Sequence, residues 1–206
     1  MRHFNRRISQ RTKSVLVMAT LVCAPSLGAQ RSGAVAASPT VAPKEGLQFD
    51  FLIGQWEVVT KPLAKTLGQR IHGVQKLPGV WKAWRALDGW GIEDELRLTD
   101  ASGNPRLLTH TVRFFDSKAR KWNLSTIDIY QGIVTASSAE LKGKAMIVSS
   151  QGKEADGGVY LSRGSFTNIT AQTFMYRLDR SYDNGKSWTE GFTTIEAKRT
   201  AAMAPR

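Results

Sequence analysis

The stretch "FDFLIGQW", residues 49–56, stands where the chain changes from an aperiodic segment to regular alternation of apolar and polar residues. The segment "GLQFDFLIG" (46–54) is the one helical-looking piece of the chain, and it is predicted to form a short turn. Gly54 and Trp56 then lead into "WEVVT" (56–60), which is the first predicted strand because successive strand residues face opposite sides. The fold class therefore has to be predicted from the strands that follow this turn.

Further short alternating runs come next, and each is bounded by turn residues such as Gly, Pro, Asn and Asp. The pattern predicts an all-β chain of about ten strands joined mainly by hairpins. The runs after the first are residues 69–77, 80–87, 92–98, 106–115, 121–130, 133–141, 144–150, 159–169, 173–182 and 187–199.

Consecutive hairpins must hide the edges of their sheet, and an up-and-down barrel does so by closing on itself. A sandwich is the competing architecture. The helical turn followed by Gly54-x-Trp56 resembles the opening of lipocalins and other calycin barrels, and this resemblance favours a single antiparallel up-and-down β-barrel over residues 46–200. It also implies that Trp56 closes one end and that a basic residue of the last strand lies across it. Arg199 is the candidate, with Lys198 as the alternative.

The resemblance extends over most of residues 46–199. The motifs "FDFLIGQWEV", "GWGIEDELR", "VRFFDSKARKWNLS" and "SYDNGKSWTE" together resemble the DUF1579-type family of bacterial proteins. This family implies a small lipocalin-like barrel, and it carries no established reaction that could be transferred to these residues.

The stretch "SYDNGKSW" (181–188) fits the pattern S-x-D-x-G-x-S-W and resembles the Asp-box hairpin of sialidase-type propellers. A propeller enzyme would repeat such a turn at a blade-length spacing, whereas this chain has one copy. We therefore predict a structural hairpin turn. Gly185 tolerates a positive φ, Asp183 accepts bonds from the turn amides, and Trp188 covers the turn.

The first 29 residues are basic and then apolar, which is typical of a secretory signal peptide, with cleavage predicted after Ala29 or, alternatively, after Ala36. Residues 30–45 are predicted to be a flexible linker and residues 201–206 a disordered tail, so the protein is expected to be exported, either periplasmic or secreted. The only cysteine, Cys23, falls in the signal, which excludes thiol chemistry from the mature chain.

Of the formal net charge of +12, five positive charges lie before residue 30, which leaves 12 − 5 = +7 for the mature chain, where basic residues are spread among acidic ones and not gathered into blocks. This distribution suits contact with an anionic envelope surface, and it argues against nucleic-acid binding, which requires a basic stripe or a recognition element.

Alternation places Asp94 on one face of its run together with Ile92 and Leu96, and a buried carboxylate needs a partner. Arg113 is the predicted partner, although the run 106–115 has two faces and either one could line the lumen. One interpretation is a polar cluster inside the barrel, and the other is a set of outward charges or a structural ion-pair network. Further candidates for the cluster are Asp128, Arg163, Tyr176 and Arg177.

The sequence leaves three functions open. The leading hypothesis is a binding module that holds one small apolar or amphipathic ligand in its lumen. The second is an isomerase or cyclase that uses Asp94, Arg113 and Asp128 for acid–base chemistry, and the third is a filled barrel that acts as an envelope interaction protein. No cofactor or metal is predicted. His72 and His110 lack a third zinc ligand, and haem held by His110, as in the nitrobindin-type barrels that the fold distantly resembles, is the minority alternative.

Overall fold

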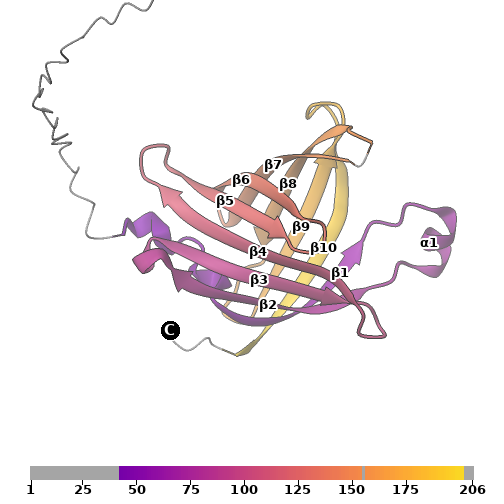
Figure 1. Ribbon diagram of the computed structural model, residues 1–206, viewed down its shortest axis with the longest axis horizontal. Coiled ribbons are helices and arrows are strands. Elements are labelled where there is room, and N and C mark those ends of the chain that lie inside the picture. The colour runs from indigo at the N-terminus through magenta and orange to yellow at the C-terminus, as the bar shows by residue number, and fades with distance from the viewer. Residues whose placement is uncertain (1–41, 155, 202–206) are drawn as a thin grey trace, which may run out of the picture. The chain divides into compact units, whose positions relative to one another are not determined.

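The computed structural model describes residues 42–154 and 156–201, so the predicted signal peptide, most of the predicted linker and residues 202–206 lie outside the described part. Ten antiparallel strands form a closed barrel in which each strand pairs with its neighbours in sequence and β1 pairs with β10 (Figure 1). The strands are β1 (Gly54–Pro62), β2 (Leu77–Ala86), β3 (Gly91–Thr99), β4 (Pro105–Asp116), β5 (Lys121–Asp128), β6 (Ile133–Lys142), β7 (Ala145–Lys153), β8 (Val159–Thr167), β9 (Thr173–Ser181) and β10 (Thr189–Ala201).

The barrel confirms the predicted up-and-down architecture and excludes the sandwich, because pairing of β1 with β10 leaves no sheet edge open. The physical cause is local: short turns join all neighbouring strands except β1 and β2, and the apolar face of each strand turns inward. Among the described residues, no helix is long and apolar enough to cross a membrane.

The run 69–77 was predicted to be a strand, and this prediction is wrong. Residues Leu67–His72 form the short helix α1, and β2 begins only at Leu77. Thr66 starts the helix through a capping box: its hydroxyl accepts a hydrogen bond from the Gln69 amide, and the Gln69 side chain accepts one from the Thr66 amide, each at 3.2 Å. Two satisfied helix-end amides outweigh the weak alternation of this run.

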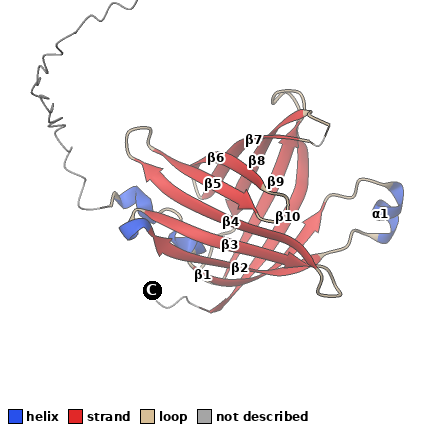
Figure 2. Cartoon of the chain, viewed as in Figure 1, coloured by secondary structure: helices blue, strands red, loops and turns tan. Residues whose placement is uncertain are grey.

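One end of the barrel is closed by two short 3-10 turns, η1 (Lys44–Leu47) and η2 (Asp50–Leu52), which Figure 2 shows at the end opposite α1. They carry Phe49 and Leu52 into the core, where both are fully buried. Trp56 Nε1 donates to the Leu52 carbonyl at 2.7 Å, and Arg85 holds the turns through the Gly46 carbonyl at 2.9 Å and the Asp50 carboxylate. The helical turn therefore acts as a plug.

Arg199 connects this plug to β10, the last strand. Its guanidinium lies 4.0 Å from the centre of the Trp56 ring and donates to the carbonyls of Ile53 and Phe51 at 2.6 and 3.0 Å. Lys198 pairs in register with Glu57 on β1, so Arg199 and not Lys198 lies across the tryptophan.

The hairpin between β9 and β10 contains the Asp-box-like turn. The Asp183 carboxylate accepts hydrogen bonds from the Ser187 hydroxyl at 2.6 Å, the Ser187 amide at 2.9 Å and the Ser181 hydroxyl at 2.8 Å. These bonds, with the Ser187 hydroxyl contributing most, lower the pKa of Asp183 to about 2. Asn184 and Gly185 adopt φ angles of 58° and 88°, the conformation that the turn requires. The motif thus forms a self-contained turn.

Candidate functional site

The barrel encloses a cavity of about 270 Å³ between the plug and the end of the barrel where α1 lies. The interior is therefore filled only in part, at the plugged end. Trp81, Asp94, Arg113, Phe166 and Tyr176 line the cavity toward the plug. Gln151, Tyr160 and Arg180 line it toward the opposite end, where the long loop with α1 joins β1 to β2.

The cavity wall carries a continuous band of polar side chains, called here the polar belt. It forms because residues directly opposite one another on paired strands share one face of the sheet. The belt has two rows, which meet on β6, where two successive inward positions carry Thr135 and Ser137. The first row is Asp94, Thr111, Thr126 and Thr135, on β3 to β6, and the second is Ser137, Ser150, Ser162 and Arg180, on β6 to β9.

Apolar side chains line the same cavity on β2 and β10, which carry no belt residue, and at further positions of β3 and β9. Trp81 lies on β2, Leu96 on β3, Leu178 on β9 and Ile195 on β10. The cavity therefore has one wall rich in hydrogen-bonding groups and another that is apolar.

Most hydroxyls of the belt have no protein partner. Thr111 and Thr126 share a hydrogen bond of 3.1 Å between their Oγ1 atoms. In the part of the chain that the structure describes, the other four hydroxyls bond to no protein group. These four belong to Thr135, Ser137, Ser150 and Ser162. Ser162 is buried and the other three residues are partly buried, so these hydroxyls face the cavity and are available to bond to a guest molecule or to water.

The predicted Asp94–Arg113 pair is present at the inner end of the cavity. Only 1% of Asp94 and 4% of Arg113 are exposed, and the two side chains form a direct ion pair. Asp94 Oδ1 also accepts a hydrogen bond of 2.6 Å from Trp81 Nε1. Burial lowers the pKa of Arg113 to about 9, whereas the contact with the Asp94 carboxylate favours its charged form. The pair is thus internally neutralised and its carboxylate is occupied.

Tyr176 also lies in the cavity wall, as predicted. Its ring packs against Phe166 with centroids 4.8 Å apart and covers Gly164, where a Cβ atom would come within 2.3 Å of the tyrosine oxygen. Burial raises the pKa of Tyr176 to about 12, and the neighbouring Arg113 opposes this rise. The phenol is therefore protonated at neutral pH and can donate one hydrogen bond.

The outer part of the cavity is bordered by Arg180, which sequence reasoning missed. Its guanidinium lies 4.0 Å from the ring centres of both Tyr160 and Phe192 and donates to Glu154 at 2.7 Å. Tyr182 donates to the same carboxylate oxygen at 2.9 Å. The charge of Arg180 is therefore neutralised at the rim. The alternation of "TFMYRLDRSY" places Arg180 on the same face as Tyr176, which is a signal that could have identified it.

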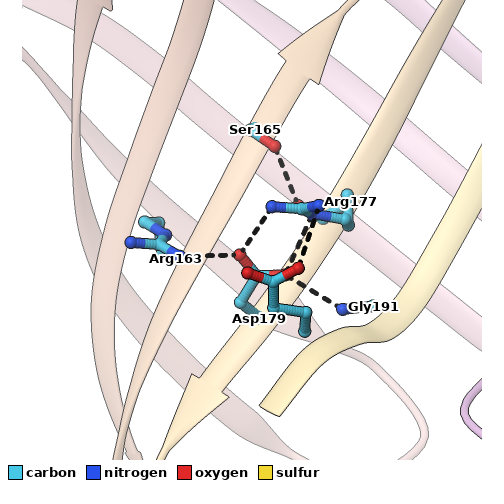
Figure 3. Close-up of polar contacts among 6 residues, drawn as sticks. Arg163, Ser165, Arg177, Asp179 and Gly191 are labelled. Carbon is cyan, nitrogen blue, oxygen red and sulfur yellow. Dashed lines mark hydrogen bonds and ion pairs between the residues drawn. The ribbon is translucent and has the colours of Figure 1, made fainter. Parts of the chain in front are cut away.

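Arg163, predicted to lie in the internal cluster, lies on the outer face of β8 (Figure 3), so this prediction is wrong. Its neighbours Ser162 and Gly164 line the cavity, and alternation turns Arg163 outward. There it donates to Asp179 at 3.0 Å and lies 4.4 Å from the centre of the Trp188 ring. Trp188 thus stacks on this arginine at the end of its turn.

Asp179 collects the polar groups of this outer cluster. It accepts bonds from Arg163, from Arg177 at 3.0 Å and from the Gly191 amide at 3.0 Å (Figure 3). Burial alone would raise the pKa of Asp179, but these donors outweigh it and hold the pKa below its usual value. The Gly191 amide belongs to the irregular segment where the β9–β10 register shifts, so the cluster stabilises that irregularity.

Asp128 does not join the cluster either. It lies at the end of β5, where its carboxylate accepts bonds from the amides of Tyr130 and Gln131 at 3.0 and 3.1 Å. The carboxylate is thus bound within the turn that follows β5, and Asp128 is not among the residues that line the cavity. Asp94, Arg113 and Asp128 therefore do not assemble into one acid–base group.

His110 lies on the face of β4 opposite Thr111 and Arg113, beside Glu93 at 3.5 Å and the Trp84 ring at 6.0 Å. It is not among the residues that line the cavity. Within the described ranges, no group of three His, Cys, Asp or Glu side chains could hold a metal ion.

No family model and no curated protein matches the chain. Among solved structures, a de novo designed fluorescence-activating β-barrel has 10% identity and a TM-score of 0.36, with coverage of 73% of this chain and 95% of its own. A second structure, EF1p2_mFAP2b bound to DFHBI, has 11% identity and a TM-score of 0.36, with coverage of 75% and 98%. Such distant likenesses carry no inference about a ligand of this chain, and the strand pairing itself establishes the barrel.

Proposed function

We propose that this protein binds one small, uncharged, amphipathic molecule in the barrel cavity. The observation that carries the proposal is the set of four belt hydroxyls that bond to no group in the described residues, Thr135, Ser137, Ser150 and Ser162. They lie in a cavity whose other wall is apolar. A ligand with hydroxyl or carbonyl groups along one side and hydrocarbon along the other satisfies both walls.

Charge and size narrow the class of ligand. The described lining residues carry three charges, and each is already paired: Asp94 with Arg113, and Arg180 with Glu154. An ionic ligand would have to break one of these pairs, so an uncharged molecule is favoured. The cavity of about 270 Å³ lies just below the roughly 300–1,000 Å³ of typical ligand pockets. The ligand is therefore smaller than a drug-sized molecule.

The first experiment is native mass spectrometry of the protein purified from its own source, with solvent extraction of any molecule that co-purifies. A stoichiometric uncharged compound is expected. A protein that is bare, and that gains no thermal stability from a panel of small uncharged hydroxy and carbonyl compounds, contradicts the proposal.

Two serines that are neighbours in β7 provide a matched test of the location. Ser150 lines the cavity, whereas Ser149 lies on the exposed outer face. Ser150→Leu fills part of the cavity and removes a belt hydroxyl, so it is expected to abolish binding of the extracted compound in calorimetry. Ser149→Leu is expected to bind as the wild type does. Equal binding by both variants would place the ligand outside the barrel.

We further propose that the chain is exported and belongs with the DUF1579-type proteins, on the strength of residues 1–29 and of the four sequence motifs that resemble this family. Sequencing the N-terminus of the protein from the exported fraction tests the first point. A start at Gln30 or Ala37 is expected, and a start at Met1 contradicts export by this signal.

A further inference from the structure

The loop between β1 and β2 differs from the other connections of the barrel because it is long and contains α1. Figure 1 shows this loop extending away from the strands at the end opposite the plug. None of the helix residues is buried. Leu67 and Ile71 occupy positions i and i+4, which share one helix face, and they are 72% and 67% exposed.

The loop is basic as well as apolar. Residues 63–76 include Lys65, Arg70 and Lys76 and no acidic residue. In the part of the chain that the structure describes, none of the three forms an ion pair. The other described loops at this end of the barrel carry an acidic residue or no charge. Two exposed aliphatic side chains are therefore flanked by positive charge that nothing in the described protein neutralises.

The root of the loop is anchored even though its tip is exposed. The Leu63 amide donates to the Phe192 carbonyl at 3.0 Å, and the Lys65 ammonium lies 4.7 Å from the centre of the Phe192 ring. The capping box at Thr66 then starts the helix in a defined direction. The exposed helix α1 therefore projects from a loop base that is anchored to the barrel.

From this combination we infer that the α1 loop docks on an anionic lipid surface, with Leu67 and Ile71 inserted at the interface and Lys65, Arg70 and Lys76 contacting lipid phosphates. Short basic segments with a few apolar side chains bind anionic bilayers in this way. A second copy of the chain fits the surface less well, because the same loop would meet its own positive charge. A protein partner usually requires roughly 800 Å² on each side, which two side chains on a convex tip do not supply.

The position of the α1 loop determines which end of the barrel faces the lipid. β1 ends and β2 begins at the end of the barrel opposite the plug, so docking through α1 brings that end toward the lipid. The inference itself rests on the exposed loop and not on the proposed luminal ligand, and each can fail without the other.

The test is co-sedimentation of the full chain with vesicles of equal parts phosphatidylglycerol and phosphatidylcholine, compared with phosphatidylcholine alone. Because residues 1–41 are common to every variant, differences among variants report on the loop. The wild type is expected to sediment with the anionic vesicles and to be released by high salt. The triple variant Lys65→Gln, Arg70→Gln, Lys76→Gln is expected to lose roughly 100-fold in partition coefficient, at about fivefold for each charge.

The double variant Leu67→Ser, Ile71→Ser is expected to lose roughly tenfold. Its matched control is Leu47→Ser, Leu141→Ser, which removes two exposed leucines at the plugged end and is expected to bind as the wild type does. Wild-type levels of binding by both loop variants, or equal loss in the control, would overturn the inference. So would an oligomer, seen by analytical ultracentrifugation, that the Leu67→Ser, Ile71→Ser variant abolishes, because the loop would then contact a second copy.

A second measurement does not depend on loss of binding. In a Cys23→Ser, Ile71→Cys chain labelled with an environment-sensitive fluorophore, the emission is expected to shift to the blue on addition of phosphatidylglycerol vesicles. An unshifted spectrum under conditions in which the protein sediments would show that another surface binds the lipid.

Discussion

Replacement of Asp94 by Asn tests whether the inner end of the cavity is held by a desolvated ion pair. The change keeps the volume of the side chain and an oxygen that can accept from Trp81 Nε1, but it removes the negative charge that faces Arg113. The guanidinium, 4% exposed and 5.2 Å from the centre of the Phe49 ring, is then left without a counter-ion.

Removing one partner of a buried ion pair costs about 3–5 kcal/mol. Domains of this kind have a total stability of about 5–15 kcal/mol, so the loss is a large fraction of the whole. With a urea m-value of about 2 kcal/mol/M, the unfolding midpoint of Asp94→Asn is expected to fall by about 1.5–2.5 M.

The assay is equilibrium unfolding in urea, followed by tryptophan fluorescence and far-UV circular dichroism. Glu95→Gln, the next residue of β3, is the matched control. Its partner Arg97 is half exposed, so the loss is expected to stay below about 1 kcal/mol. In a double-mutant cycle with Arg113→Met, the coupling energy is expected to reach about 2 kcal/mol or more. A loss below about 1 kcal/mol for Asp94→Asn would refute the view of a dry, mutually dependent pair.

Three further changes have defined outcomes. The Ser187 bonds lower the pKa of Asp183 from 3.8 to about 2. The ionised carboxylate therefore stabilises the fold fully above pH 3.8, and this contribution is lost as the pH falls toward 2. Calorimetric melting temperatures of Asp183→Asn should vary less over this interval than those of the wild type. Tyr176 has a pKa of about 12, so an alkaline absorbance titration should show one tyrosine that ionises at a higher pH than the others, and Tyr176→Phe should remove this step. The stability that the phenol provides is present below its ordinary pKa of 10 and is lost as the pH rises toward 12. Gly164→Ala places a Cβ atom 2.3 Å from the Tyr176 oxygen and should cost about 1–3 kcal/mol in urea unfolding, whereas Gly46→Ala, which meets nothing within 4 Å, should cost little; equal losses would show that the tyrosine ring moves aside freely.

Features that depend on neighbours in the chain could be predicted from the amino-acid sequence alone. Strand alternation and turn residues located β1 and β3 to β10 nearly at their observed positions, and "YDNGK" located the β9–β10 turn. These features are local, because a strand is defined by alternation and a tight turn by a few residues that tolerate its backbone angles. The same logic failed at Leu67–His72, where the capping box of Thr66 and Gln69 was the stronger local signal and was overlooked.

The inward face of each strand, by contrast, was set by closure of the barrel. The run that became β4 carries Arg113 on one face and His110 on the other, and both faces hold polar residues, so alternation alone could not choose. Closure turned Arg113 toward Asp94 and His110 outward. On β8 it turned Ser162 inward and Arg163 outward. The polar belt arises in the same way, because cross-strand register aligns residues from neighbouring strands, and that register is a property of the closed sheet and not of any single segment.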